Sequence, residues 1–192
     1  MTLACATKAE ERVARKLGAS TALVGIGARR ALPEGPVVSF GLAGGLHDGI
    51  ECGEVLDATR VVDTDGVVLW EGGPLGVSGA RTATILAVDA VVDDPAERRT
   101  LHERTGADAI DMESGELART GRLAGCLRAV SDTPSRPLGP LTEVLDANGR
   151  LRPGGIARAL AAPRSTGRAL ADVRHALAAL QQVVTRPEEV AA

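Results

Sequence analysis

The chain contains almost no aromatic residues: of its 192 residues, Phe40 and Trp70 are aromatic and tyrosine is absent. Proteins that bind single-stranded nucleic acid stack the bases on aromatic side chains, so this composition excludes that class of surface. The net charge is −3, with acidic and basic residues interspersed and no basic stripe, so we expect no nucleic acid as a partner. The core must be built from Ala, Val, Leu and Ile.

A metal-ligand pattern and a disulfide framework are also missing. The three cysteines and three histidines are Cys5, Cys52, Cys126, His47, His102 and His175. They are scattered, and no spacing among them resembles a metal site, so we expect no metal. An odd number of cysteines, two of them in apolar runs, favours reduced thiols over disulfides.

The sequence shows no segment typical of a targeting peptide or a membrane span. Its N-terminus lacks a charged region followed by a long apolar stretch. No run approaches the roughly 20 apolar residues that cross a bilayer. We therefore expect a cytoplasmic protein without a transmembrane segment.

What the sequence does contain is the pattern of an α/β protein. Its 44% hydrophobic and 24% charged residues are ordinary for a globular chain, and the length predicts one domain, residues 1–192. Expected strands are 20–26, 36–40, 54–62, 67–70, 82–88, 107–113 and 127–133; expected helices are 8–17, 95–105, 114–123, 156–162 and 170–184. This alternation predicts a mixed, largely parallel central sheet flanked by helices.

Acidic residues end two short apolar runs, 107–113 and 127–133. Ligands of open α/β sheets bind beyond the carboxyl ends of the strands, so Glu113 and Asp132 could share one cleft. An Asp there can protonate a leaving group, and a Glu can accept hydrogen bonds from sugar hydroxyls. The structural alternative is that each acid is a helix N-cap or a turn residue.

A glycine-rich run, residues 41–45, follows an expected strand and is predicted to be a turn. Glycines let the backbone approach a ligand closely and free its N–H groups for binding, which makes Leu42, Ala43 and Gly44 candidate contacts. The run lacks the spacing of a Walker loop and of a dinucleotide-binding fingerprint.

Four stretches in this order resemble the nucleoside phosphorylase/nucleosidase superfamily, which includes the methylthioadenosine/S-adenosylhomocysteine nucleosidases. They are Gly25–Gly27, Val38–Leu46, Ile110–Ser114 and Leu127–Asp132. The Asp-Met-Glu-Ser and Arg-Ala-Val-Ser-Asp elements are the specific ones. Residues 39–46 and 146–153 look most similar to the hopanoid-associated branch, whose substrate is adenosylhopane. The resemblance implies a nucleoside phosphorylase-like fold, a small nucleoside as substrate and a homodimer.

The resemblance also implies roles for the residues at the two strand ends. Asp132 matches the general acid that protonates or hydrogen-bonds purine N7, and Ser131 matches the neighbour that orients it. Glu113 matches the acid that binds the ribose hydroxyls. Met112 matches the side chain that packs under the sugar.

Three further residues take roles from the resemblance. Val91 and Val92 fall where the family grips the base through backbone groups and a stacking side chain, usually Phe. Glu10 falls near the N-terminal acid that positions the attacking water. Glu10 also fits a capping box with Thr7, which is a structural role, and Glu11 is an equally available carboxylate.

These roles describe cleavage of an N-glycosidic bond. The reaction builds positive charge on the ribose and negative charge on the purine. A protonated carboxyl near N7 neutralises the leaving group, and carboxylates around the sugar stabilise the oxocarbenium-like state. Neither step needs a metal or an organic cofactor, so we expect none. The sequence thus predicts an adenine nucleosidase acting on a 5′-substituted adenosine.

A phosphorylase is the first alternative. Superfamily phosphorylases grip phosphate with an Arg and a Ser/Thr around the glycine turn, where this chain has Ser39 and Leu42. Arg29 and Arg30 could supply the charge, although such arginines are more often solvated surface residues. Water is therefore the favoured nucleophile.

A degenerate, non-catalytic nucleoside-binding or interaction protein is the second alternative. The helix expected between Gly27 and Pro36 is nearly missing, which leaves a shortened helix after the second strand. The stretch from Glu113 to Asp132 is short by about one helical turn. Val91 stands where the family has an aromatic side chain.

Overall fold

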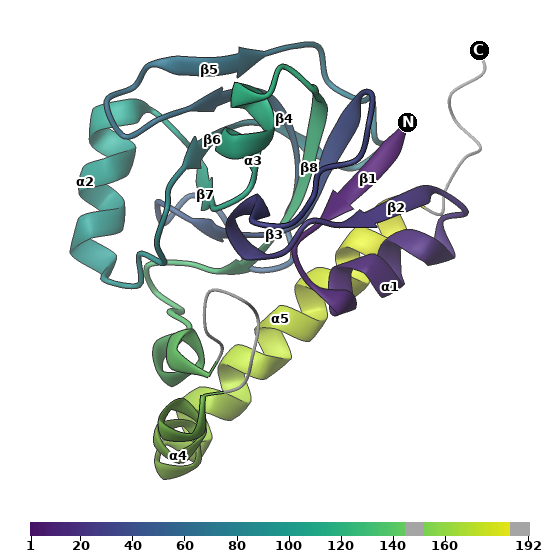
Figure 1. Cartoon of the computed structure of the whole chain (residues 1–192). Coiled ribbons are helices and arrows are strands. Elements are labelled where there is room, and N and C mark those ends of the chain that lie inside the picture. Colours follow the sequence, from purple (N-terminus) through teal and green to yellow (C-terminus); the bar gives the residue numbers. More distant parts are fainter. Residues whose placement is uncertain (145–151, 185–192) are drawn as a thin grey trace.

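Eight strands form one mixed sheet in the computed structural model, which describes residues 1–144 and 152–184 (Figure 1). They are β1 (Thr2–Cys5), β2 (Ser20–Leu23), β3 (Val37–Gly45), β4 (Val55–Val62), β5 (Val68–Glu71), β6 (Arg81–Ala87), β7 (Ala109–Asp111) and β8 (Leu123–Asp132). The pairs β1–β2, β1–β3, β3–β8, β4–β6 and β6–β7 are parallel, and β3–β7, β4–β5 and β4–β8 are antiparallel. The predicted mixed, largely parallel sheet is confirmed.

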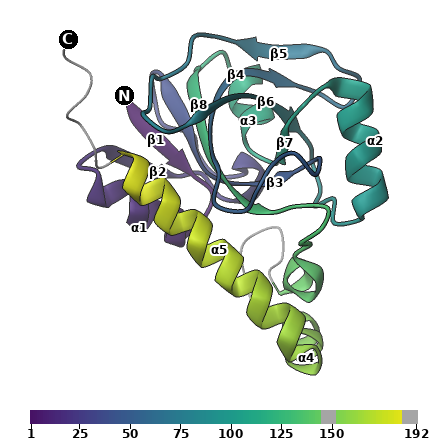
Figure 2. The ribbon, with the colours of Figure 1, turned by 180° about the vertical axis from the view of Figure 1, so that it is seen from behind.

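Helices pack around this sheet, except for the one at residues 153–161, which lies away from the strands against the C-terminal helix. They are α1 (Lys8–Lys16), α2 (Pro95–Thr105), α3 (Ser114–Arg119), α4 (Pro153–Ala161) and α5 (Pro163–Val184), with short 3-10 turns η1 (Ile26–Ala28) and η2 (Gly139–Glu143). Figures 1 and 2 show α1 and α5 side by side and α2 at the far edge of the sheet. No helix within the described ranges combines the length and apolarity that crossing a membrane requires.

Local signals fix the ends of two helices. The Thr7 hydroxyl accepts from the Glu10 N–H, and the Glu10 carboxylate accepts from the Thr7 N–H at 2.7 Å, so the predicted capping box is present. Asp94 caps α2 ahead of Pro95, and Gly106 ends that helix with a φ of 67°.

Several predicted boundaries are wrong, and the C-terminal helix expected from Leu170 begins at Pro163. The glycine run 41–45 is the second half of β3 rather than a turn, because β8 and β7 supply ladder partners along it. The helix expected over 114–123 ends at Arg119, because the chain turns at Gly121 and enters β8 at Leu123. Strand β1 was not predicted, although its parallel pairing with β2 and β3 gives it a clear place in the sheet.

The buried side chains form separate clusters around the sheet. One includes Leu117 of α3 and many strand residues, and another packs Val13 of α1 and Leu180 of α5 against β3 and β8. Leu170, expected on the buried face of α5, is 40% exposed, and Ala169 takes the buried place instead.

The predicted shortening after the second strand is present. Past the 3-10 turn Ile26–Ala28, residues 29–36 form neither helix nor strand before β3 begins. Most of the segment 146–153, which carries part of the likeness to the hopanoid-associated branch, lies outside the described residues.

Candidate active site

A pocket of about 150 Å³ lies where β3, β6, β7 and β8 end. It is lined mostly by apolar side chains, with a few convergent polar groups, as is usual for a small-molecule site. Eight of the ten predicted site residues line it: Leu42, Ala43, Gly44, Val91, Val92, Met112, Ser131 and Asp132. The other two, Glu10 and Glu113, belong to an adjoining network of buried polar groups.

Asp132, the last residue of β8, is buried, and each of its carboxylate oxygens has a polar partner. One carboxylate oxygen accepts from the Ser131 hydroxyl at 2.6 Å, and the other pairs with the guanidinium of Arg98. Burial raises the pKa of Asp132 above its usual value, while Arg98 and Ser131 lower it. A carboxyl under these opposing influences can hold a proton and give it up to a ligand.

The loop before α2 forms the opposite wall of the pocket. Val91 is 52% exposed at the mouth, and the Val92 carbonyl accepts from Arg98 Nε at 2.8 Å. The Asp93 carboxylate accepts from two backbone N–H groups, Leu138 and Gly139, each at 3.0 Å. These two bonds hold Leu138 over the pocket that it helps to line.

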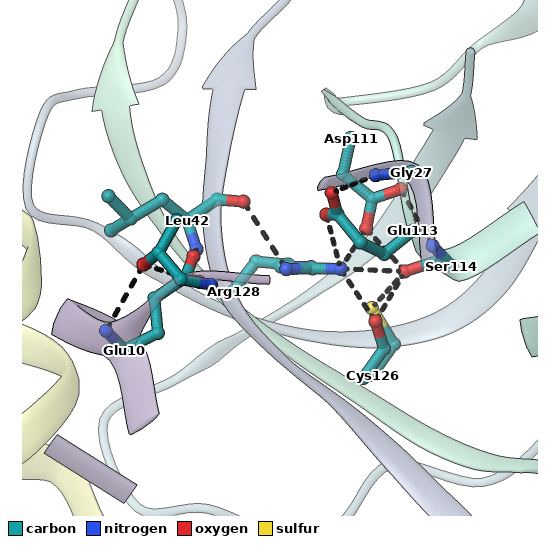
Figure 3. A network of polar contacts seen from close by, with 10 residues as sticks. Glu10, Gly27, Leu42, Asp111, Glu113, Ser114, Cys126 and Arg128 are labelled. Carbon is teal, nitrogen blue, oxygen red and sulfur yellow. Dashed lines mark hydrogen bonds and ion pairs between the residues drawn. The ribbon is translucent and has the colours of Figure 1, made fainter. Parts of the chain in front are cut away.

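Arg128 of β8 is the centre of the adjoining network (Figure 3). Its Nη2 forms an ion pair with Asp111, lies 3.4 Å from Glu113 Oε2 and donates to the Ser39 hydroxyl at 2.6 Å. Nη1 donates to the Leu42 carbonyl at 3.4 Å. Burial alone lowers the pKa of Arg128, but the surrounding acids raise it above its usual value, so the guanidinium stays charged.

Glu113 reaches this network from the end of β7. Its Oε1 accepts from the Gly27 N–H at 3.0 Å, which ties η1 to the site. Burial, opposed by Arg128 and reinforced by Asp111 and Glu10, raises the pKa of Glu113 to about 7. The group therefore changes charge near neutral pH, where its strength as a hydrogen-bond acceptor changes too.

Glu10 serves the helix cap and the site together. One oxygen accepts from Thr7, and the other accepts from the Leu42 N–H at 2.9 Å. This approach requires a glycine in β3, because a Cβ on Gly41 would overlap the Glu10 carboxylate. The capping role is present, and it also places the carboxylate beside the pocket wall, as Figure 3 shows.

Ser39 and Leu42, which were weighed as part of a phosphate site, are already bonded to other residues of the chain. Ser39 is fully buried and bonded to Arg128 and Ser114. Arg29 and Arg30 are exposed beside the η1 turn, which also carries the Gly27 N–H that binds Glu113.

Three buried charged residues of the site had no predicted role: Arg98, Asp111 and Arg128. Arg128 and Asp111 had a visible signal, since each is a charge within or at the end of an apolar strand and must find a buried partner. Arg98 had none, because it lies in the charged stretch Glu97–Arg99, which is typical of a solvated helix face.

Comparisons with known proteins bear on the fold. No protein-family model matches the chain, and no curated protein matches its sequence. Solved structures do match. Futalosine hydrolase of Helicobacter pylori superposes with a TM-score of 0.60 at 14% identity, covering 95% of each chain.

Two methylthioadenosine-type nucleosidases match as well. The H. pylori 5′-methylthioadenosine/S-adenosylhomocysteine nucleosidase gives a TM-score of 0.59 at 15% identity, covering 95% of this chain and 96% of its own. The Arabidopsis thaliana 5′-methylthioadenosine nucleosidase gives 0.57 at 14% identity, covering 96% and 92%. The chain has the nucleosidase fold. The likeness to the nucleoside phosphorylase/nucleosidase superfamily that four sequence motifs predicted is thus confirmed at the level of the fold.

Proposed function

We propose that this protein is an enzyme, a purine nucleosidase that uses water to cleave the N-glycosidic bond of an adenosine-type nucleoside. The observation that carries the proposal is the position of Asp132, a buried carboxyl at a strand end in a mostly apolar pocket. The nucleosidase fold of the solved neighbours agrees with it. No metal or organic cofactor is required by this chemistry.

In this proposal the purine lies between β3 and the loop that carries Val91 and Val92. Asp132 gives its proton to N7, which neutralises the charge that develops on the base as the bond breaks. Met112 packs under the ribose, and Glu113 accepts hydrogen bonds from the ribose hydroxyls. Glu10 holds the attacking water on the other side of the sugar.

The direct test is release of free base. The purified protein is incubated with adenosine and with 5′-methylthioadenosine, and free adenine is followed by liquid chromatography. We expect adenine and a reducing sugar in buffer without phosphate. A folded protein that releases no base from either nucleoside, yet binds adenine in calorimetry, would instead be a non-catalytic binding protein.

The nucleophile gives a second expected result. Because Ser39 is buried and the Leu42 N–H already binds Glu10, we expect that added phosphate neither accelerates base release nor yields ribose 1-phosphate. A phosphate site needs fixed donors and positive charge. The contrary result would be base release that occurs only with phosphate and is lost in the Arg29→Ala or Arg30→Ala variant. That result would make the enzyme a phosphorylase.

Glu113 gives a third expected result. Glu113→Gln should weaken cleavage of adenosine more than cleavage of 2′-deoxyadenosine, because a charged acceptor makes the stronger bond to a hydroxyl. Because the pKa of Glu113 is raised to about 7, the difference between the variant and the original protein should grow as pH rises through 7. The ratio of kcat/KM for the two nucleosides at pH 6 and pH 8 measures this. Equal losses for both sugars would show that Glu113 does not bind the 2′-hydroxyl.

The identity of the base, the substituent on the sugar and the oligomeric state are proposed as well. We propose adenine as the base and a 5′-substituted ribose as the sugar, with the lipid-bearing adenosylhopane of the hopanoid-associated branch as one such substrate. A homodimer is proposed from the family resemblance, and sedimentation equilibrium tests it.

A further inference from the structure

Arg98, on the first turns of α2, is 1% exposed although the helix positions beside it face solvent. Its Nε donates to the Val92 carbonyl, its Nη1 donates to the Gly45 carbonyl at 3.2 Å, and its Nη2 pairs with Asp132. One guanidinium therefore joins the end of β3, the loop before α2 and the end of β8. These are three walls of the base pocket.

Gly44 makes room for this arrangement. A Cβ built on Gly44 would lie 3.0 Å from Asp132 Oδ2 and 3.2 Å from Arg98 Nη2, closer than side chains normally pack. The absence of a side chain lets β3 run directly over the ion pair. The pair is thereby held against the pocket wall rather than exposed to water.

Asp132 faces one cation and several groups that carry or could carry negative charge. Arg98 supplies the cation from α2; Asp93 in the preceding loop lies 3.8 Å from the Arg98 guanidinium. Asp111 lines the same pocket from β7. The pKa of the Cys52 thiol, in the loop before β4, is raised by burial and to a smaller extent by Asp132. Negative charge on Asp132 is disfavoured by burial and by Asp93, and it is stabilised by the Arg98 guanidinium and by the Ser131 hydroxyl, of which Arg98 is the cation.

We propose that Arg98 is the positioning residue of the general acid, and that its guanidinium stabilises the negative charge left on Asp132 when the proton moves to the purine. The inference rests on the proposed function. In the step, the Asp132 proton passes to N7 and the C1′–N9 bond breaks, with its electron pair going to the base. Water adds to C1′ and releases one proton, and Asp132 takes up one proton before the next turnover.

Arg98 stays charged throughout and acts through Asp132 rather than on the substrate. Burial alone would make Asp132 a weak acid that keeps its proton. The Arg98 guanidinium, paired with Oδ2 of Asp132, stabilises the deprotonated carboxylate and so makes Asp132 a stronger acid. The hydrogen bonds from Arg98 to the Val92 and Gly45 carbonyls also fix the position of the Asp132 carboxyl relative to the two segments that would hold the base.

The test compares Arg98→Met, which removes the charge at similar length, with Arg98→Lys, which keeps it. In the methionine variant kcat should fall about 10²-fold with little change in KM, because the lost interaction forms as the proton moves. The basic limb of its kcat/KM profile should move to higher pH, because burial then raises the pKa of Asp132 without opposition from Arg98. In the lysine variant the limb should stay near its original pH and part of kcat should return.

Arg99→Met is the matched control, since Arg99 lies on the exposed face of α2 and pairs with Asp48 at 3.3 Å. It should leave kcat and the pH profile unchanged. An original protein that releases no base contradicts the proposed function and this inference with it. An active protein whose methionine variant keeps its kcat, or its pH limb, contradicts this inference alone. If circular dichroism shows that the methionine variant does not fold, the lysine variant decides, and a shifted limb there is the contradicting result.

Discussion

Replacing Asp132 by asparagine should lower the rate of base release about 10²-fold or more while the protein remains folded. The amide keeps the shape of the carboxyl and can still bond to Ser131, but it has no proton to give to N7. The rate is measured as adenine released from adenosine at a saturating concentration. The fold is checked by circular dichroism and by the midpoint of thermal unfolding.

Asp65→Asn is the control for this substitution. Asp65 is exposed in the turn between β4 and β5, far along the chain from the pocket residues, and its replacement should leave the rate unchanged. Near-normal turnover by a folded Asp132→Asn protein would remove Asp132 from the role of general acid.

Replacing Arg128 by methionine should cost about 3–5 kcal/mol of unfolding free energy. The change leaves the buried carboxyl groups of Asp111 and Glu113 without their cation, and an unpaired buried charge is among the most destabilising defects. Urea unfolding measures the loss. Arg60→Met is the control, because Arg60 pairs with Glu71 on the surface at 3.0 Å and such pairs contribute at most about 1 kcal/mol.

The loss in the Arg128 variant should depend on pH. In the original protein, the pKa of Glu113 is raised from 4.5 to about 7, and Arg128 opposes that shift. Between these values the folded protein holds a proton that the unfolded chain has released, so this group's contribution to stability falls as pH rises. Without Arg128 the opposition disappears, and the variant should lose more stability at pH 8 than at pH 5. Equal losses at both pH values would show that Arg128 does not oppose the rise in the pKa of Glu113.

The fold was predictable from sequence wherever a local signal and the tertiary arrangement agree. Thr7 and Glu10 begin α1, and Asp94 begins α2, through contacts within four residues of each other. At the glycine run 41–45 the local signal and the tertiary arrangement disagree. Its composition is typical of a turn, but β7 and β8, which lie far along the chain, extend the strand through it.

The candidate site likewise contains residues that the sequence predicted and residues that it did not. Glu113 and Asp132 were predicted to share one cleft; Asp132 lines the pocket together with Met112, whereas Glu113 lies in the adjoining network around Arg128. Arg98 could not be predicted, because its burial depends on where α2 settles against β3 and β8. For Glu10 the sequence offered a cap or a catalytic acid as separate possibilities. Its two oxygens divide between the cap and the wall of the site.

The long span of the contacts around Arg128 has a consequence for folding kinetics. Arg128 and Ser39 are 89 residues apart, Gly27 and Glu113 are 86 apart, and Glu10 and Leu42 are 32 apart. Contacts between distant residues form slowly, because the loop entropy is lost before the contact stabilises anything. We therefore expect the polar centre to form late in folding, after helices such as α1. The proposed base release should therefore require the fully assembled molecule, and its regain after dilution from urea should lag behind regain of helical circular dichroism.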